Sequence, residues 1–260
     1  PSPDNSPSTP PDSVPITEDS TSAYSTATIP QFTIVATWNI DKQATYDAPI
    51  TACVHGNLDI LHCPEPALHM SPGTRESATL VNAADKAGYT LYVTTHSHIY
   101  VRQATIHTRL ISQRHIYNGR LHTFIFQGDD NHHTALMCVY AFQRNYKTTA
   151  QDTAASPHNP THFNTQVFAL ATELLSMYDP LTLVVMGDFQ HTIDDTALHR
   201  MGATQKPPPG DILTPFLHHP FNLVSVIPTQ HPTLAYHTWF SKSGSRQAGL
   251  DHIRMAKWLI

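Results

Sequence analysis

The chain has 260 residues, with 15 Lys and Arg, 20 Asp and Glu, 19 His and 3 Cys. This length is enough for one large domain or two small ones, and three cysteines do not make a disulfide framework. No apolar run approaches the ~20 residues of a membrane span, and the chain does not start with a secretory signal. We therefore expect a soluble, intracellular globular protein that does not act in a membrane.

The first 30 residues differ from the rest of the chain. They are mostly Pro, Ser and Thr, and they carry four acidic residues but no Lys or Arg. Such a segment cannot bury enough apolar surface to offset its ordering entropy, so we expect residues 1–30 to be a disordered tail or linker. The folded domain is then expected to span residues 31–260 and to be nearly neutral, which weakly disfavours tight binding to nucleic acid.

Short strands predominate among the predicted elements, with helices between some of them. Apolar, β-branched and aromatic runs predict strands at 32–40, 57–65, 89–95, 119–127, 134–142, 181–189, 221–227, 235–241 and 250–255. Helical spacing of apolar residues predicts helices at 75–87 and 163–178, and polar or Pro-rich composition predicts loops at 147–162 and 206–215. The order of these elements indicates a mixed α and β protein.

Several predicted strands end in polar side chains. These are Asn39, Glu65, Asp188 and Asp251. Taken singly, each is explained at least as well by a turn or a cap, which is the more frequent role of such residues. Together they are oxygen donors held by strand ends, and carboxylate and amide oxygens are the ligands that suit Mg²⁺ or Mn²⁺.

Five segments, in order, match the motifs of a known family. They are TWNI (37–40), LDILHCPE (58–65), VYAFQ (139–143), VVMGDFQ (184–190) and HTWFSKSGSRQAGLDHI (237–253). This set resembles the endonuclease/exonuclease/phosphatase superfamily from about Phe32 to Trp258. The LDHI form and the residues before it look most like the apurinic-type endonuclease domains of LINE-like (non-LTR) retrotransposons.

The resemblance implies a fold and a metal site. The fold is an α+β protein of the DNase I-like kind, a four-layer α/β sandwich of two mixed, largely antiparallel sheets flanked by helices. The implied cofactor is Mg²⁺ or Mn²⁺, held by Glu65 and Asn39. A metal of this kind neutralises charge that develops on a phosphodiester, while a carboxylate prepares water for attack.

The same resemblance implies roles for further residues. Asp188 orients or deprotonates the attacking water, Gln190 helps to hold the phosphate, and Tyr140 contacts the scissile phosphate. Asp251 matches the residue that supports a catalytic His near the C-terminus. The expected substrate-binding residues are Gln143, Trp239 and Arg246. Trp239 and Arg246 suit base stacking and phosphate contact, although Trp239 fits a core position equally well.

The sequence departs from the family pattern in several places. Gln190 and Gln143 stand where the family has Asn, Phe142 stands where it has Pro, and Pro64 precedes the metal-binding Glu65. Proline lacks an N–H and fixes φ, so it alters the backbone that carries Glu65. The chain ends nine residues after Asp251, and we expect the domain to lack its final strand and the His there. His252 is not a substitute, because it alternates to the opposite face of its strand.

We therefore expect metal-dependent phosphodiester hydrolysis, in first place by a DNA-nicking endonuclease domain of a retrotransposon-type polyprotein. The implied partners are double-stranded target DNA and a downstream reverse transcriptase domain, and the family analogy implies a nuclear location. Two alternatives stay open. One is a phosphodiesterase or phosphatase that acts on a small molecule or a lipid, which the near-neutral charge favours. The other is a non-catalytic, truncated remnant, which the departures favour.

Overall fold

The computed structural model describes residues 35–39, 47–128, 131–142, 159–190, 200–201, 216, 218–230, 239–240, 247–248 and 251–256. The strands are β1 (Val35–Thr37), β2 (Ile60–Pro64), β3 (Tyr89–Val93), β4 (Ser97–Arg102), β5 (Leu110–Ile116), β6 (Leu121–Gln127), β7 (His133–Tyr140), β8 (Leu181–Asp188), β9 (Arg200–Met201), β10 (Leu223–Ser225), β11 (Trp239–Phe240), β12 (Gln247–Ala248) and β13 (Asp251–Ala256). The helices are α1 (Ala48–His55), α2 (Arg75–Lys86), α3 (Gln103–Arg109), α4 (Pro160–Met177) and α6 (Val226–Gln230), with 3₁₀ turns η1 (Leu68–Met70) and η2 (Tyr117–Gly119).

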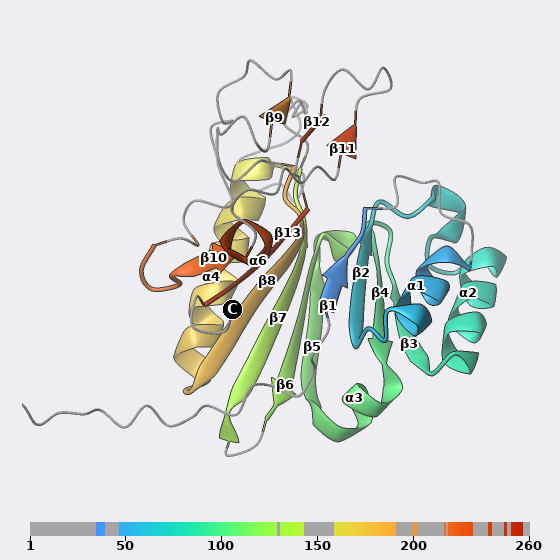
Figure 1. Cartoon of the computed structure of the whole chain (residues 1–260), viewed down its shortest axis with the longest axis horizontal. Coiled ribbons are helices and arrows are strands. Elements are labelled where there is room, and N and C mark those ends of the chain that lie inside the picture. The colour runs from blue at the N-terminus through green and yellow to red at the C-terminus, as the bar shows by residue number, and fades with distance from the viewer. Residues whose placement is uncertain are drawn as a thin grey trace, which may run out of the picture.

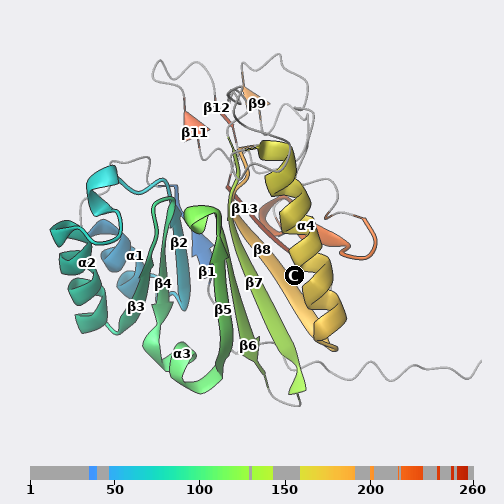
Figure 2. The ribbon, with the colours of Figure 1, turned by 180° about the vertical axis from the view of Figure 1, so that it is seen from behind.

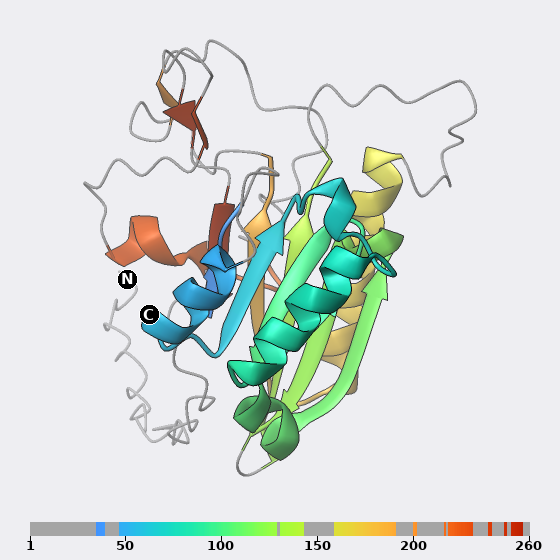
Figure 3. The same ribbon diagram turned by 90° about the vertical axis from the view of Figure 1, so that its right-hand side faces the viewer.

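Two mixed sheets form the centre of the molecule (Figure 1). The smaller sheet has the strand order β1-β2-β4-β3, and the larger has the order β10-β13-β8-β7-β6-β5. The pairs β1–β2 and β7–β8 are parallel, and the other pairs within these two sheets are antiparallel. Helices α1 and α2 lie on the outer side of the smaller sheet (Figure 3), and α4 covers the larger one (Figure 2). This confirms the predicted four-layer, DNase I-like sandwich.

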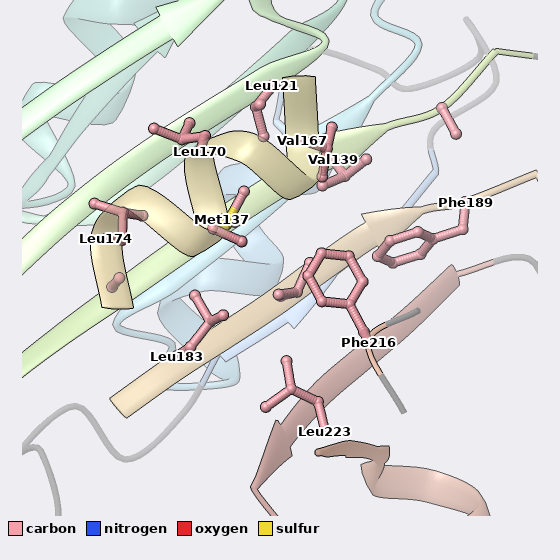
Figure 4. Close-up of a cluster of buried hydrophobic side chains, with 14 of the residues drawn as sticks. Leu121, Met137, Val139, Val167, Leu170, Leu174, Leu183, Phe189, Phe216 and Leu223 are labelled. Carbon is pink, nitrogen blue, oxygen red and sulfur yellow. The ribbon is translucent and has the colours of Figure 1, made fainter. Parts of the chain in front are cut away.

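The central strands β7 and β8 are apolar on both faces because both faces are covered. Val184 and Met186 of β8 belong to the cluster between the two sheets, which also contains Ile60 and Phe124. The alternate residue Val185 belongs to the cluster under α4. Figure 4 shows this second cluster, in which leucines of α4 lie over β7 and β8. The strand predicted at 181–189 is therefore present as β8, and its apolar residues 183–186 are buried from both sides.

A glycine fixes how closely β8 approaches β7. Gly187 has a φ of 142°, and a Cβ at this position would collide with the backbone carbonyl of Val139. Only glycine adopts this conformation without strain and leaves room for the neighbouring strand. Gly187 therefore sets the backbone immediately before Asp188.

The structure corrects two predicted boundaries. Helix α4 begins at Pro160, so residues 160–162 are helical and not part of a loop. The Asn159 side chain caps it by accepting hydrogen bonds from the backbone N–H groups of Thr161 and His162 at 2.9 and 3.2 Å, and proline is well suited to the first helical position. The predicted strand 221–227 is shorter, since β10 ends at Ser225 and α6 follows it.

Other elements were not predicted. Helices α1 and α3 and strands β4, β5, β9 and β12 are present outside the predicted elements. Strands β9 and β12 form a small sheet with β11, which lies within the predicted strand 235–241. The three cysteines are free and buried, as their apolar surroundings indicate. None of the described helices is long and apolar enough to span a membrane. The expected tail, residues 1–30, lies outside the described residues.

Candidate active site

Four strands bring polar side chains to one end of the sandwich. Asn39 follows β1, Glu65 follows β2, and Tyr140 and Asp188 are the last residues of β7 and β8. Both strand pairs are parallel, so each pair delivers its carboxyl ends to the same edge, and β2 and β8 run toward the same end (Figure 3). The predicted convergence of these residues is therefore a consequence of strand direction.

Asn39 joins the two sheets at this end. Its Nδ2 donates to Asp188 Oδ2 at 2.7 Å and lies 3.4 Å from Glu65 Oε2. One side chain thus contacts carboxylates that are carried by different sheets. The carboxylate of Glu65 and the amide of Asn39, which contacts it, carry hard oxygen donors at this end of the sandwich.

Asp188 is fully buried and is held by several donors. In addition to Asn39, Gln190 donates to it twice, from its backbone N to Oδ1 at 2.8 Å and from Nε2 to Oδ2 at 2.7 Å. These bonds place Gln190 in the left-handed region, with a φ of 54°. A carboxylate accepts only, so three N–H donors match its hydrogen-bonding needs. The extra methylene of Gln190 does not prevent the amide from reaching Asp188.

Tyr140 links the second carboxylate to the larger sheet. Its hydroxyl donates to Glu65 Oε1, and the ring is nearly fully buried. Burial first, and then the hydrogen bond to Glu65, raise the pKa of Tyr140 above its usual value. The phenol therefore stays protonated at neutral pH and is available as a donor.

Glu65 has an unusual backbone. Its φ is 57°, in the left-handed region, between Pro64 and Pro66. Its N–H donates to the carbonyl of His96 at 3.2 Å, which holds the turn after β2 against the turn before β4. Non-glycine residues rarely adopt a positive φ, and such conformations cluster at functional sites. The departure at Pro64 thus accompanies an altered backbone, but the carboxylate still meets Asn39 and Tyr140.

Sequence reasoning did not identify Arg120. Its guanidinium lies over the rings of Tyr140 and Phe142, at 4.6 and 4.1 Å from their centres. It also donates to the carbonyls of Tyr140 and Ala141, both at 3.3 Å. Arg120 therefore fixes the segment that carries Tyr140, in the place where Phe142 replaces the Pro of the family. A lone Arg directly before an apolar strand was the available signal.

The remaining predicted residues are placed only in part. Asp251 lies opposite Asp188 in the antiparallel pairing of β13 with β8, which puts position 251 beside the site. His252 is buried on the other face of the sheet, with its ring 5.9 Å from that of Phe189. Trp239 belongs to β11, and the described part of the structure does not include its side chain. Gln143 and Arg246 lie outside the described residues.

The donor set fits a magnesium-type ion. Among the described residues no group of three or more His, Cys, Asp and Glu converges on one point. Mg²⁺ does not need such a group, because it keeps several waters and typically binds one or two carboxylates. Glu65, with the amide oxygen of Asn39 beside it and Asp188 nearby, is a donor set of this kind, and it contains no His or Cys that would favour zinc.

No protein-family model and no curated protein matches the sequence. Among solved structures, the 3′ phosphatase NExo from Neisseria bound to a product DNA hairpin is similar at 15% identity, covering 86% of each chain, with a TM-score of 0.61. Truncated Caenorhabditis elegans TDP2 is similar at 14% identity, covering 85% of this chain and 82% of that chain, with a TM-score of 0.53.

The endonuclease domain of TRAS1, a telomere-specific non-LTR retrotransposon, has 13% identity and a TM-score of 0.49, with 86% of this chain and 84% of that chain covered. At that TM-score it does not favour the retrotransposon branch. The likenesses to NExo and TDP2 show the fold alone, and they do not single out a substrate.

Proposed function

We propose that the chain is a metal-dependent phosphodiesterase that cleaves DNA as an endonuclease. The observation that carries this proposal is the convergence of Asn39, Glu65, Asp188 and Tyr140 at the ends of four strands. Two carboxylates, an amide and a phenol within hydrogen-bonding reach form a set that suits phosphodiester hydrolysis. The shared fold with NExo, whose structure holds DNA, supports a nucleic acid substrate.

Each residue has a role that its geometry supports. Glu65 and Asn39 would hold Mg²⁺ or Mn²⁺, which when bound neutralises negative charge on the phosphate. Asp188 is fixed by three hydrogen bonds and is the acceptor for a proton of the attacking water. Tyr140 stays protonated, and its one hydroxyl hydrogen bond, made to Glu65 Oε1 in this structure, would be made to a phosphate oxygen instead when substrate is bound, with Arg120 keeping its segment in place. The amide of Gln190 is a second donor next to Asp188.

The retrotransposon assignment is a finer part of the same proposal. It rests on the LDHI segment, of which Asp251 is placed beside Asp188 by the register of β13. If it is right, the domain nicks double-stranded target DNA and acts with a downstream reverse transcriptase in the same polypeptide. The near-neutral charge of residues 31–260 favours a second candidate, a phosphodiesterase for a small molecule or a lipid head group.

The test is nicking of supercoiled plasmid by this chain in Mg²⁺, with EDTA and with the variant Glu65→Gln. Glu173→Gln is a matched control, because Glu173 is an exposed carboxylate on α4. We expect open-circle product from the wild type and the control, and its loss with EDTA or Glu65→Gln. Abasic duplex, inositol phosphates and bis-p-nitrophenyl phosphate complete the panel.

The panel separates the candidates. Hydrolysis of the small substrates without nicking would replace the endonuclease by the small-molecule phosphodiesterase. Absence of hydrolysis on the whole panel would favour the remnant. Nicking that survives Glu65→Gln would refute the metal site assigned to Glu65.

A further inference from the structure

A pocket opens beside the candidate active site. It has a volume of about 410 Å³, within the range of ~300–1,000 Å³ that is usual for small-ligand sites. Its walls come from β5, η2, the start of α4, the segment after β7 and the turn before β4. Strand β5 is antiparallel to β6, which is antiparallel to β7, so β5 and β7 end on the same side. The pocket, which is lined by Ile116 at the end of β5 and by Phe142 after β7, therefore lies at the same end of the sandwich as Tyr140.

The pocket is cationic. Arg114 and Arg120 both line it, and none of its described lining residues is acidic. Arg114 is an exposed residue of the edge strand β5, so its side chain is accessible from solvent. Two guanidinium groups without a lining carboxylate favour an anion, and phosphate matches the planar fork of arginine.

Aromatic and amide groups line the same pocket. Tyr117 and Phe142 both line the pocket and make edge contacts with Phe163 of α4. The ring centre of Phe163 lies 5.3 Å from that of Tyr117 and 5.4 Å from that of Phe142. Gln166 of α4 adds an amide with donor and acceptor atoms. Rigid aromatic walls next to arginines are the combination that binds stacked bases together with their phosphates.

The pocket shares residues with the candidate active site. Arg120 lines the pocket and lies over the ring of Tyr140, while His96 lines the pocket and accepts the hydrogen bond from the Glu65 N–H. A ligand in the pocket is therefore adjacent to the phosphate position that Glu65 and Tyr140 define. A substrate that continues beyond the scissile phosphate would pass directly into it.

We propose that this pocket binds one nucleotide unit of the substrate strand, its base against Tyr117 and its phosphate on Arg114. The inference rests on the proposed function and adds to it a binding subsite for a nucleotide of the substrate strand beside the scissile phosphate. A small phosphoester or a single inositol phosphate would leave the pocket unused.

The test measures binding without catalysis. A short fluorescein-labelled single-stranded oligodeoxynucleotide is titrated with the protein in EDTA, and the anisotropy gives Kd at several salt concentrations. Arg114→Ala should weaken binding about tenfold and lower the salt slope by about 0.7. Tyr117→Leu should weaken binding about fivefold or more through lost stacking. The control is Lys86→Ala, which removes an exposed charge at the end of α2 and should bind like the wild type.

A fully abasic strand of the same length separates the base from the phosphate. On this strand the effect of Tyr117→Leu should disappear, and that of Arg114→Ala should persist. Circular dichroism and Tm of each variant establish that it is folded. If both variants bind the oligonucleotide like Lys86→Ala, the pocket is not a binding site. If only Arg114→Ala weakens binding, the pocket takes a plain anion and the nucleotide proposal is wrong.

The results distinguish failure of the pocket proposal from failure of the proposed function. If the wild type nicks plasmid while both pocket variants bind the oligonucleotide as tightly as the wild type, only the pocket proposal is wrong. Conversely, absence of hydrolysis together with the expected loss of binding would overturn the enzymatic proposal and leave the nucleotide pocket standing.

Discussion

His122 should destabilise the protein, and its replacement by leucine should therefore stabilise it. The side chain is 1% exposed in the layer between the sheets, and neither ring nitrogen has a hydrogen-bond partner among the described residues. Its ring stacks on Phe124 and on His115, at centre distances of 6.1 and 5.2 Å. Burial first, and then the neighbouring His115, lower the pKa of His122 to about 3.

The expected size follows from two contributions. Buried polar atoms without partners cost about 1–3 kcal/mol, and loss of the ring contacts returns about 1 kcal/mol of this, so His122→Leu should gain about 1 kcal/mol near pH 7.5. Below about pH 6.5, His122 takes up a proton in the unfolded chain, whereas in the folded chain it does so only near pH 3. The stability of the wild type therefore falls as pH falls through this window, by about 2 kcal/mol at pH 5 for this group. The variant should then be more stable by about 3 kcal/mol.

Urea unfolding of the wild type and His122→Leu at about pH 7.5 and pH 5 measures these differences. His55→Leu is the control, because it replaces an exposed histidine at the end of α1 and leaves the layer between the sheets unchanged. An advantage of His122→Leu that is equal at both pH values would refute the assignment of the acid sensitivity to His122. A variant less stable than the wild type at both pH values would refute the argument from unsatisfied nitrogens.

Three further predictions concern other parts of the molecule. Gly187→Ala should lower the free energy of unfolding by about 4 kcal/mol or more, because a Cβ at this position would collide with the Val139 carbonyl. Gly73→Ala, where the Cβ has open space and only the positive φ is unfavourable, should lower it by about 1 kcal/mol. Thermal unfolding and soluble yield compare the two variants, and similar losses would contradict the steric argument. Tyr140→Phe keeps the ring against Arg120 but removes the hydroxyl that contacts Glu65 and that we assign to the phosphate. The kcat on DNA should therefore fall about 100-fold with little change in Tm. An unchanged kcat would exclude the phenol from the reaction. Burial raises the pKa of Cys53 to about 12 and raises that of Cys138, so at pH 8 neither thiol should react with a disulfide reagent until urea is added; fast labelling of the folded protein would contradict their burial.

The sequence predicts best where a residue's environment is uniform along its element. The run 183–186 is apolar throughout because β8 is covered on both faces, and the strand then ends at the carboxylate of Asp188. The same reasoning places Asn39 and Glu65 at strand ends. The four-layer fold itself was predicted from the resemblance of the five motifs to a known family, because the pattern of strands and helices alone indicates only a mixed α and β protein.

The sequence predicts poorly where the structure mixes environments within a few residues. Strand β5 is an edge strand with five exposed residues in the middle, so its pattern is too polar to indicate a strand. Strand β4 buries His98, whose Nε2 lies 3.1 Å from the Met70 carbonyl oxygen, and buried histidines conceal an apolar pattern. The contribution of Arg120 depends on contacts with Tyr140 and Phe142 of another strand, so its position before an apolar strand is the only local signal and does not reveal this role.

The direct pairing of β7, β8 and β13 places positions 140, 188 and 251 side by side in one row across three strands. Their relative positions are therefore inherited from backbone hydrogen bonds, which do not depend on the identity of the surrounding side chains. During divergence nearly every core residue can be exchanged for another of suitable volume without moving this row. A slip of one residue in any of the three strands, in contrast, would turn the row to the opposite face and remove the site at once. Selection for activity thus acts on the pairing register itself, and a fold can stay recognisable after most of its sequence has changed.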